Sequence, residues 1–230
     1  MVAEDRLTPQ TRKAVRKILL GAPLVTAALF ADEYRVTHQE TFRWHFVDIP
    51  FDASGYDETR DCEVLTNGDC IIHAIDRAKA VIKDPKAKPF DRADALKYLV
   101  HFVGDLHQPF HAIERNGDEG GNKVKVKFFD DDDTNLHSVW DSGLILHTER
   151  PAEDYAALLK QQLAGMNESV WRTGTTVDWA LESHAAGKLA YVDNHAVLGQ
   201  AYQDAQIVVV DKRLALAAAR LAWILEEILN

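Results

Sequence analysis

The sequence lacks a long hydrophobic run and an excess of basic charge. Hydrophobic residues make up 47% of its 230 residues, but the apolar stretch ILLGAPLVTAALF at 18–30 is short and contains Pro23. This stretch predicts one or two core helices rather than a membrane span. The formal net charge of −10 argues against a general basic surface for nucleic acid. It is still compatible with a polyanionic substrate, because bound divalent cations reverse the charge locally.

Cysteine is also scarce. Cys62 and Cys70 are the only two, and they lie eight residues apart in a polar segment. A local disulfide fits this spacing and would indicate an oxidising compartment, while two reduced thiols are the alternative. Met1–Arg6 has no apolar core of the kind found in a secretory signal.

The length suits one well-filled hydrophobic core. Most of the chain has helical periodicity, and two segments do not. Residues 42–52 are aromatic and β-branched, which predicts a buried extended segment. Residues 123–130 alternate Lys with apolar side chains and predict a strand, followed by Asp130–Asp133 as the turn of a hairpin. The prediction is one mainly α-helical domain over residues 1–230 with a small two-stranded hairpin.

The segment Leu99–His111, LVHFVGDLHQPFH, carries the most distinctive pattern. His101 and Asp105 are four residues apart on a predicted helix, so their side chains share one face and can bind one metal ion. Pro109 should end that helix and direct His111 elsewhere. Burying Asp105 among apolar residues is costly unless a cation neutralises it, and the segment contains no Lys or Arg.

The pair His137 and Asp141 repeats this spacing on a second predicted helix, with Asn135 as its N-cap. Imidazole and carboxylate ligands without thiolate are typical of catalytic zinc. Several such ligands indicate a multinuclear centre for phosphate-ester hydrolysis, in which a metal-bound water attacks. The candidate ligands are Asp32, His45, His101, Asp105, His111, His137 and Asp141.

Five blocks together resemble a known family. They are ADEYR at 31–35, WHFVD at 44–48, LVHFVGDLHQPFH at 99–111, GGN at 120–122 and NLHSVWD at 135–141. In this order they resemble the S-one/P-one type of zinc-dependent nuclease, the mung-bean-nuclease family, which is secreted and prefers single strands. The resemblance implies a mainly α-helical fold related to zinc-dependent phospholipase C, and three zinc ions.

The resemblance also implies roles for individual residues. One zinc would be held by Asp32, His45, His101 and Asp105, and a second by His111, His137 and Asp141, with Asp105 also bridging to a third zinc. Asp32 and Arg35 would be catalytic, with Arg35 stabilising charge on the scissile phosphate. Phe46 would stack on a nucleobase and Asp48 would bind its edge. Asn122 and Asn135 would also contact substrate, and Cys62 and Cys70 would form the family's short disulfide loop. His107 is interpreted as a supporting group rather than a ligand.

The chain departs from the family at its beginning. Members start with a Trp that binds the third zinc and have a His a few residues later, and neither is present in MVAEDRLTP. We therefore expect two complete zinc sites and a weak or missing third. The function implied is an endonuclease that cleaves single-stranded DNA and RNA to 5′-phosphate products, with 3′-nucleotidase activity as a further implication. The alternatives are a phospholipase-C-like zinc phosphodiesterase and a catalytically impaired zinc-binding protein. We expect a secreted or periplasmic monomer without a membrane or obligate protein partner.

Overall fold

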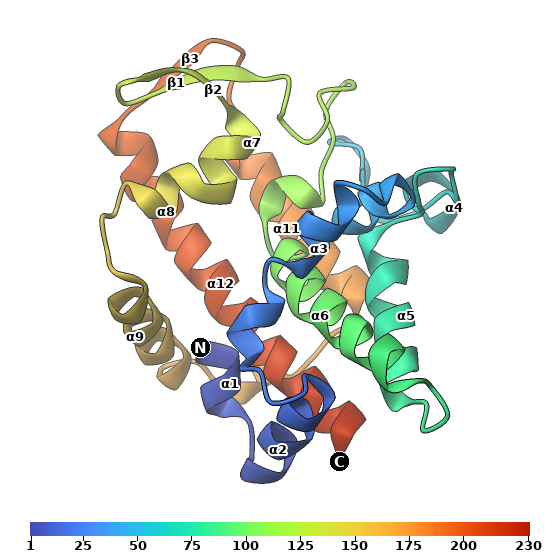
Figure 1. Ribbon diagram of the computed structural model, residues 1–230. Coiled ribbons are helices and arrows are strands. Elements are labelled where there is room, and N and C mark those ends of the chain that lie inside the picture. Colours follow the sequence, from blue (N-terminus) through green and yellow to red (C-terminus); the bar gives the residue numbers. More distant parts are fainter.

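The long C-terminal helix α12 (Gln200–Leu229) is the element on which most other helices pack. It crosses the computed structural model, which describes residues 1–230, diagonally in Figure 1. The other helical elements are α1 (Val2–Arg6), α2 (Pro9–Ile18), the 3₁₀ turn η1 (Leu24–Ala27), α3 (Phe30–Arg35), the 3₁₀ helix η2 (Gln39–His45), α4 (Glu58–Asp61), α5 (Ile71–Lys83), α6 (Pro89–Asp105), the 3₁₀ turn η3 (Pro109–His111), α7 (Leu136–Ser138), the π-helix η4 (Val139–Gly143), α8 (Leu144–Leu146), α9 (Ala152–Ala164), α10 (Glu168–Trp171) and α11 (Thr176–Ala190). The predicted mainly α-helical class is confirmed.

Local signals explain where several helices begin. The Thr8 side chain accepts a hydrogen bond from the Thr11 backbone, and Pro9 occupies the first turn of α2. A capping box between Thr175 and Asp178 begins α11. Asn135 caps α7 as predicted, because its Oδ1 accepts from the Ser138 backbone at 2.8 Å.

The main core fills the space where α5 and α6 lie along each other and against the C-terminal half of α12. Its fully buried side chains include Ile75, Leu96, Leu99 and Phe102. A second cluster of buried apolar side chains lies between the small sheet, the helices from α7 to α8 and the N-terminal half of α12. A third joins α9 and α10 to α12. The metal-ligand candidates on α6 therefore stand on a helix whose other face is fully packed.

The sheet has three strands rather than the predicted two. Strand β1 (Lys125–Phe128) pairs antiparallel with β2 (Asp131–Asn135) and parallel with β3 (Ala196–Leu198). Of the aspartates predicted as the turn, Asp130 lies in it beside Phe129, whose φ is 51°, whereas Asp131–Asp133 begin β2 instead. Strand β2 is an exposed edge, where charged side chains are tolerated and discourage pairing with other chains. The short β3 carries no periodic signal of its own.

The prediction that residues 42–52 form one extended segment is wrong for its first half. Residues through His45 belong to η2, and the chain is extended only from Phe46 onward. Tertiary hydrogen bonds decide this boundary: the Val47 N–H donates to the His111 carbonyl at 2.8 Å, and the Phe51 N–H donates to the Glu114 carbonyl at 2.7 Å. The extended half thus lies beside the segment that follows α6.

Candidate metal and substrate site

The first group of ligand candidates consists of residues from three separate elements that meet at the C-terminal end of α6. Asp32 comes from α3, His45 from the end of η2, and His101 and Asp105 from the last turns of α6. Asp32, His45 and His101 each offer an atom within 4.8 Å of the others. The Asp105 Oδ2 lies 3.0 Å from both the Nδ1 of His45 and the Nε2 of His101.

The hydrogen bonds of His101 favour a cation in this group. Its Nδ1–H donates to the Ala28 carbonyl at 2.6 Å, so the Nε2 of the neutral ring carries a lone pair. That lone pair faces the Asp105 carboxylate, and the ring nitrogens of His101 and His45 are only 3.1 Å apart. Such an arrangement needs a proton or a metal ion between the acceptors. The nitrogen and oxygen donors fit divalent zinc, and the backbone partner of the other ring nitrogen is typical of zinc-binding His.

The second group is formed by His111, His137 and Asp141. The Nε2 atoms of both histidines lie near the Asp141 carboxylate, at 3.2 Å for His111 and 3.3 Å for His137. The Nδ1–H of His137 donates to the Gly120 carbonyl at 2.7 Å, so its Nε2 also presents a lone pair. Asp141 lies within the π-helix η4, and such local widening is frequent at functional sites. These residues again fit a divalent metal.

Asp105 connects the two groups. One of its carboxylate oxygens faces His45 and His101, and the other lies 3.7 Å from the Nδ1 of His111. Burial by itself would raise the pKa of Asp105, but the neighbouring histidines outweigh it and hold that pKa well below its usual range. Burial lowers the pKa of His101, but the hydrogen bond and charge of Asp105, the Ala28 carbonyl and the charge of Asp32 together outweigh burial and raise that pKa to about 9. Asp105 therefore carries a negative charge at neutral pH and presents one carboxylate oxygen to each group.

Both groups open into one cavity of about 1070 Å³. It is also lined by four residues predicted to act on substrate, Arg35, Phe46, Asp48 and Asn122, whereas Asn135 is not among its lining residues. The terminal nitrogen of Arg35 lies 3.1 Å from Asp32. Burial raises the pKa of Asp48 to about 6 against the opposing effect of Arg43.

Two further residues at the cavity were not predicted from the sequence. Gln108 donates from its Nε2 to the Asp141 carboxylate at 2.7 Å, and its Oε1 accepts from the Phe110 backbone. Arg43 lies 3.6 Å from Asp48. Gln108 lies within the recognised block at 99–111, and Arg43 directly precedes the WHFVD block at 44–48, so their places in the sequence were the available signal. His107 points away from both groups and pairs with Arg220, which agrees with its exclusion from the ligand set.

The disulfide is confirmed between Cys62 and Cys70, so neither thiol is available to a metal. The histidines outside the blocks stay outside the site. His73 pairs with Glu58 and Asp69, and His184 contacts the Pro50 carbonyl at 3.0 Å. None of the helices has the length and apolar character needed to cross a membrane.

Comparison with known proteins decides the family. A family model described as S1/P1 Nuclease matches residues 1–230. The chain belongs to the S1/P1 nuclease family. Among the relatives of this S1/P1 family member, Endonuclease 2 of Arabidopsis thaliana is 30% identical over 78% of this chain and 62% of its own length. Nuclease S1 of Aspergillus oryzae is 29% identical over 87% of this chain and 78% of its own length. Nuclease P1 of Penicillium citrinum is 30% identical over 98% and 93% respectively. The chain thus spans less than two thirds of the length of the first relative and most of the length of the other two. Membership of this family supports the function of a nuclease, which hydrolyses phosphodiester bonds.

Proposed function

We propose that this protein is a zinc-dependent endonuclease that hydrolyses phosphodiester bonds of single-stranded DNA and RNA, leaving 5′-phosphates, with 3′-nucleotidase activity on small substrates. The observation that carries the proposal is Asp105 lying between the two His/Asp groups, at the floor of a cavity that also holds Arg35 and Phe46. Membership of the S1/P1 family supports the reaction class.

The proposed division of work follows from the side chains. The first zinc is held by Asp32, His45, His101 and Asp105, and the second by His111, His137 and Asp141. Zinc in such a centre lowers the pKa of water and polarises phosphate oxygens. Asp32 contributes to catalysis through its contact with Arg35, 3.1 Å away. The planar guanidinium of Arg35 would bind the scissile phosphate through two N–H groups.

The preference for unpaired strands depends on the part of the cavity lined by Phe46 and Asp48. Phe46 offers an aromatic face for a nucleobase and Asp48 an acceptor for its edge. A base stacked inside a duplex does not expose its face, so a site of this kind favours unpaired strands. Asn122 and Asn135 remain predicted substrate contacts. Asn122 lines the cavity, whereas Asn135 does not and caps α7. The disulfide supports the further proposal of a secreted or periplasmic protein, and we expect a monomer.

The test is degradation of heat-denatured and duplex DNA by zinc-reconstituted protein. We expect faster loss of the denatured DNA and release of 5′-phosphate ends. The His101→Ala variant is the control for contaminating nuclease and should be inactive. Equal inertness toward both substrates at full zinc occupancy would contradict the proposal, and release of phosphocholine from lipid micelles would favour the phospholipase-C-like alternative.

A further inference from the structure

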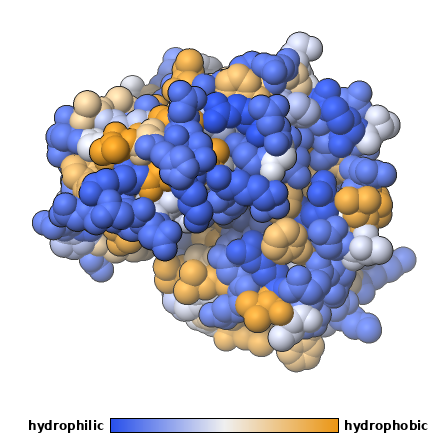
Figure 2. All heavy atoms as spheres, turned by 90° about the horizontal axis from the view of Figure 1, so that it is seen from above, coloured by the Kyte–Doolittle hydropathy of each residue, from blue (hydrophilic) through white to orange (hydrophobic).

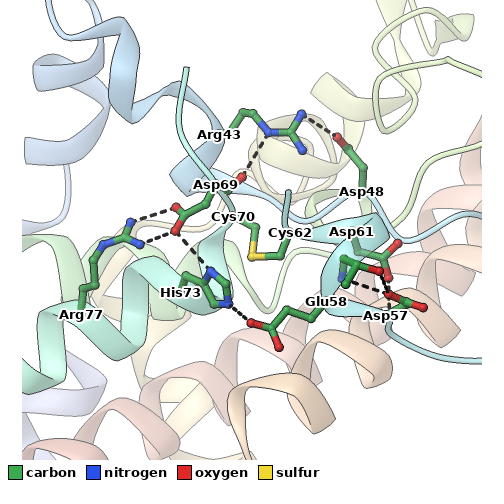
Figure 3. Close-up of a disulfide and its surroundings, with 11 residues drawn as sticks. Arg43, Asp48, Asp57, Glu58, Asp61, Cys62, Asp69, Cys70, His73 and Arg77 are labelled. Carbon is green, nitrogen blue, oxygen red and sulfur yellow. Dashed lines mark hydrogen bonds and ion pairs between the residues drawn. A yellow bond between two sulfur atoms is a disulfide. The ribbon is translucent and has the colours of Figure 1, made fainter. Parts of the chain in front are cut away.

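Arg43 is held at the edge of the cavity by the disulfide loop. Its Nε–H donates to the Asp69 carbonyl at 3.1 Å, and its backbone N–H donates to the Asn67 carbonyl at 3.0 Å. Figure 3 shows the guanidinium between Asp69 on one side and Asp48 on the other. The Arg43 side chain is only 17% exposed, so its position is determined by these contacts and not by solvent.

The loop that holds Arg43 is itself rigidly anchored. The Cys62–Cys70 disulfide closes it directly after Asp69. The Asp69 carboxylate receives two hydrogen bonds from Arg77 and lies 3.3 Å from the Nδ1 of His73. Gly68 has a φ of 109° and no room for a Cβ, which would lie 2.8 Å from the Glu40 carbonyl. The direction of the guanidinium is therefore fixed before any ligand binds.

The part of Arg43 that faces the cavity has unused hydrogen-bonding capacity. Its only side-chain hydrogen bond within the protein is from Nε, which leaves the N–H groups of both terminal nitrogens free. One terminal nitrogen lies 3.6 Å from the Asp48 Oδ2, too far for a good hydrogen bond, and Asp48 accepts no other. The guanidinium carbon is 5.7 Å from the centre of the Phe46 ring. A donor and an acceptor thus stand side by side at the edge of an aromatic platform.

This pattern matches the Watson–Crick edge of guanine. Guanine presents one carbonyl acceptor, O6, followed by two donors, N1–H and the N2 amino group. A carboxylate has two oxygens for the adjacent donors, and an arginine donates to O6. Adenine places an amino donor where guanine has O6 and an acceptor at N1, so both contacts become unfavourable. Uracil and thymine match the first two positions but place a carbonyl against the second carboxylate oxygen.

We infer that Arg43 and Asp48 together read the edge of a base stacked on Phe46 and give this enzyme a preference for guanine. The inference rests on the proposed nuclease function and adds the base at the cleavage site. Arg43 is a specificity-determining residue here, and the disulfide loop is its support. The preference is a difference between bases and leaves the attack on the phosphate unchanged.

The experiment compares short unpaired oligonucleotides that differ only in one central base, with guanine, hypoxanthine, adenine, uracil or cytosine at that place. We expect kcat/KM to be about tenfold higher for guanine than for adenine, the size of discrimination that one good two-point contact supplies. Hypoxanthine keeps O6 and N1–H but lacks the amino group, so it should fall between them. In Arg43→Leu the ratio of kcat/KM for guanine over adenine should fall to about twofold or less.

A matched control is Arg172→Leu, which removes an exposed arginine paired with Glu168 on the surface. It should retain the full guanine preference. Binding of guanosine and adenosine to the zinc-loaded protein, measured by calorimetry, gives a second readout that does not need turnover. Wild-type cleavage without a guanine preference, or a preference that survives in Arg43→Leu, overturns the inference and leaves the nuclease function standing. Absence of all cleavage contradicts the nuclease function. The affinities for guanosine and adenosine then still show whether Arg43 and Asp48 distinguish the two bases.

Discussion

At the scale of single residues, one histidine of each group is oriented by a backbone carbonyl. Ala28 accepts from His101 and Gly120 accepts from His137, and each bond turns the other ring nitrogen toward a carboxylate. Such partners fix the tautomer and ring direction, and losing a ligand usually removes the metal with it. Local geometry thus leaves one nitrogen of each of these rings free to bind a cation.

The first prediction concerns His101→Ala. Removing the imidazole leaves Asp105 with one fewer partner and the first group with one fewer ligand, so zinc content should fall from two ions per chain toward one. Thermal stability should fall with it. His147→Ala, at an exposed position outside both groups, is the matched control. Zinc analysis of the purified variants provides the measurement, and unchanged zinc content in His101→Ala would refute the assignment.

The second prediction concerns the pH dependence of base choice. Burial raises the pKa of Asp48 to about 6, with Arg43 opposing it and Glu114, Asp61 and Glu119 reinforcing it. Above pH 6 the carboxylate accepts from guanine, and below it the protonated acid loses one acceptor. The ratio of kcat/KM for guanine over adenine should therefore decline severalfold between pH 7.5 and 5. The ratio cancels losses common to both substrates, such as zinc release. Asp48→Asn should give a ratio without this pH dependence, and an equal decline in that variant would exclude Asp48 as the cause.

Sequence reasoning predicted residues that the structure brings together as candidate ligands, because their spacing carries the chemistry. His101 with Asp105 and His137 with Asp141 are local pairs, so a helical period brings them together without knowledge of the fold. Arg43 was missed because its role depends on the carbonyls of a distant loop, and a backbone carbonyl leaves no trace in residue type. Contacts made by backbone atoms are what the sequence pattern conveys least.

At the scale of elements, the loop between η3 and β1 shapes the second metal group. Gly120 has a φ of 58°, and a Cβ there would lie 2.4 Å from the Phe110 carbonyl, so the backbone itself would have to move. The Gly120 carbonyl is also the partner of His137. A glycine is required at this position by conformation and by space together.

The third prediction follows from that loop. Gly120→Ala should displace the carbonyl that orients His137 and weaken zinc binding in the second group by about tenfold or more. Gly117→Ala is a close control, because Gly117 also has a positive φ, 77°, but open space around its Cβ. Both variants carry the conformational penalty, and only Gly120→Ala should lose zinc. Competition with a zinc chelator measures the difference, and equal affinities in the two variants would show that the carbonyl does not matter.

The disulfide loop gives the fourth prediction. Replacing Cys62 and Cys70 by Ser frees the loop, which the chain-entropy argument values at about 2–3 kcal/mol of unfolding free energy for a ring of this size. Urea unfolding monitored by tryptophan fluorescence measures the loss. The same double variant should also discriminate less between guanine and adenine, since Asp69 no longer holds Arg43 as firmly. Full discrimination in a measurably destabilised variant would show that Arg77 alone is enough to support the loop.

Predictions of whole elements succeeded where the signal was periodic. The helices α2, α5 and α6 carry caps or apolar stripes in their own sequence. The extended segment after η2 and the strand β3 do not, and each depends on pairing with residues far along the chain. Tertiary hydrogen bonds override propensity in such short segments.

At the scale of the whole molecule, an acidic protein must attract an anionic substrate. Most of the face seen in Figure 2 is hydrophilic, with small separate hydrophobic groups, and the net charge is −10. The carboxylates of the cavity add to this unfavourable potential until metal ions neutralise them. Substrate binding and metal binding should therefore be coupled, and the metal-free protein should bind single strands poorly.

Metal removal should also reverse the pH dependence of stability. In the metal-free protein, burial lowers the pKa of both histidines, but the surrounding acceptors outweigh it: Asp105, Asp32 and the Ala28 carbonyl raise the pKa of His101 to about 9, and the Asp105 and Asp141 carboxylates raise that of His111. In the unfolded chain these pKa values are about 6.5, so the folded state binds more protons between pH 6.5 and 9. The stabilisation from His101 is complete below pH 6.5 and is lost as the pH rises through about 9. The raised pKa of His111 adds a loss in the same direction.

The melting temperature in excess chelator should therefore fall by about 5 °C between pH 6.5 and 9. With zinc present the slope should be flatter or opposite, because zinc competes with these protons and binds more tightly as the histidines lose them. His101→Ala provides the internal control, since it removes the group with the raised pKa and should flatten the slope measured in chelator. A melting temperature that stays constant or rises with pH in chelator would mean that these histidines are not paired with Asp105 in the metal-free protein.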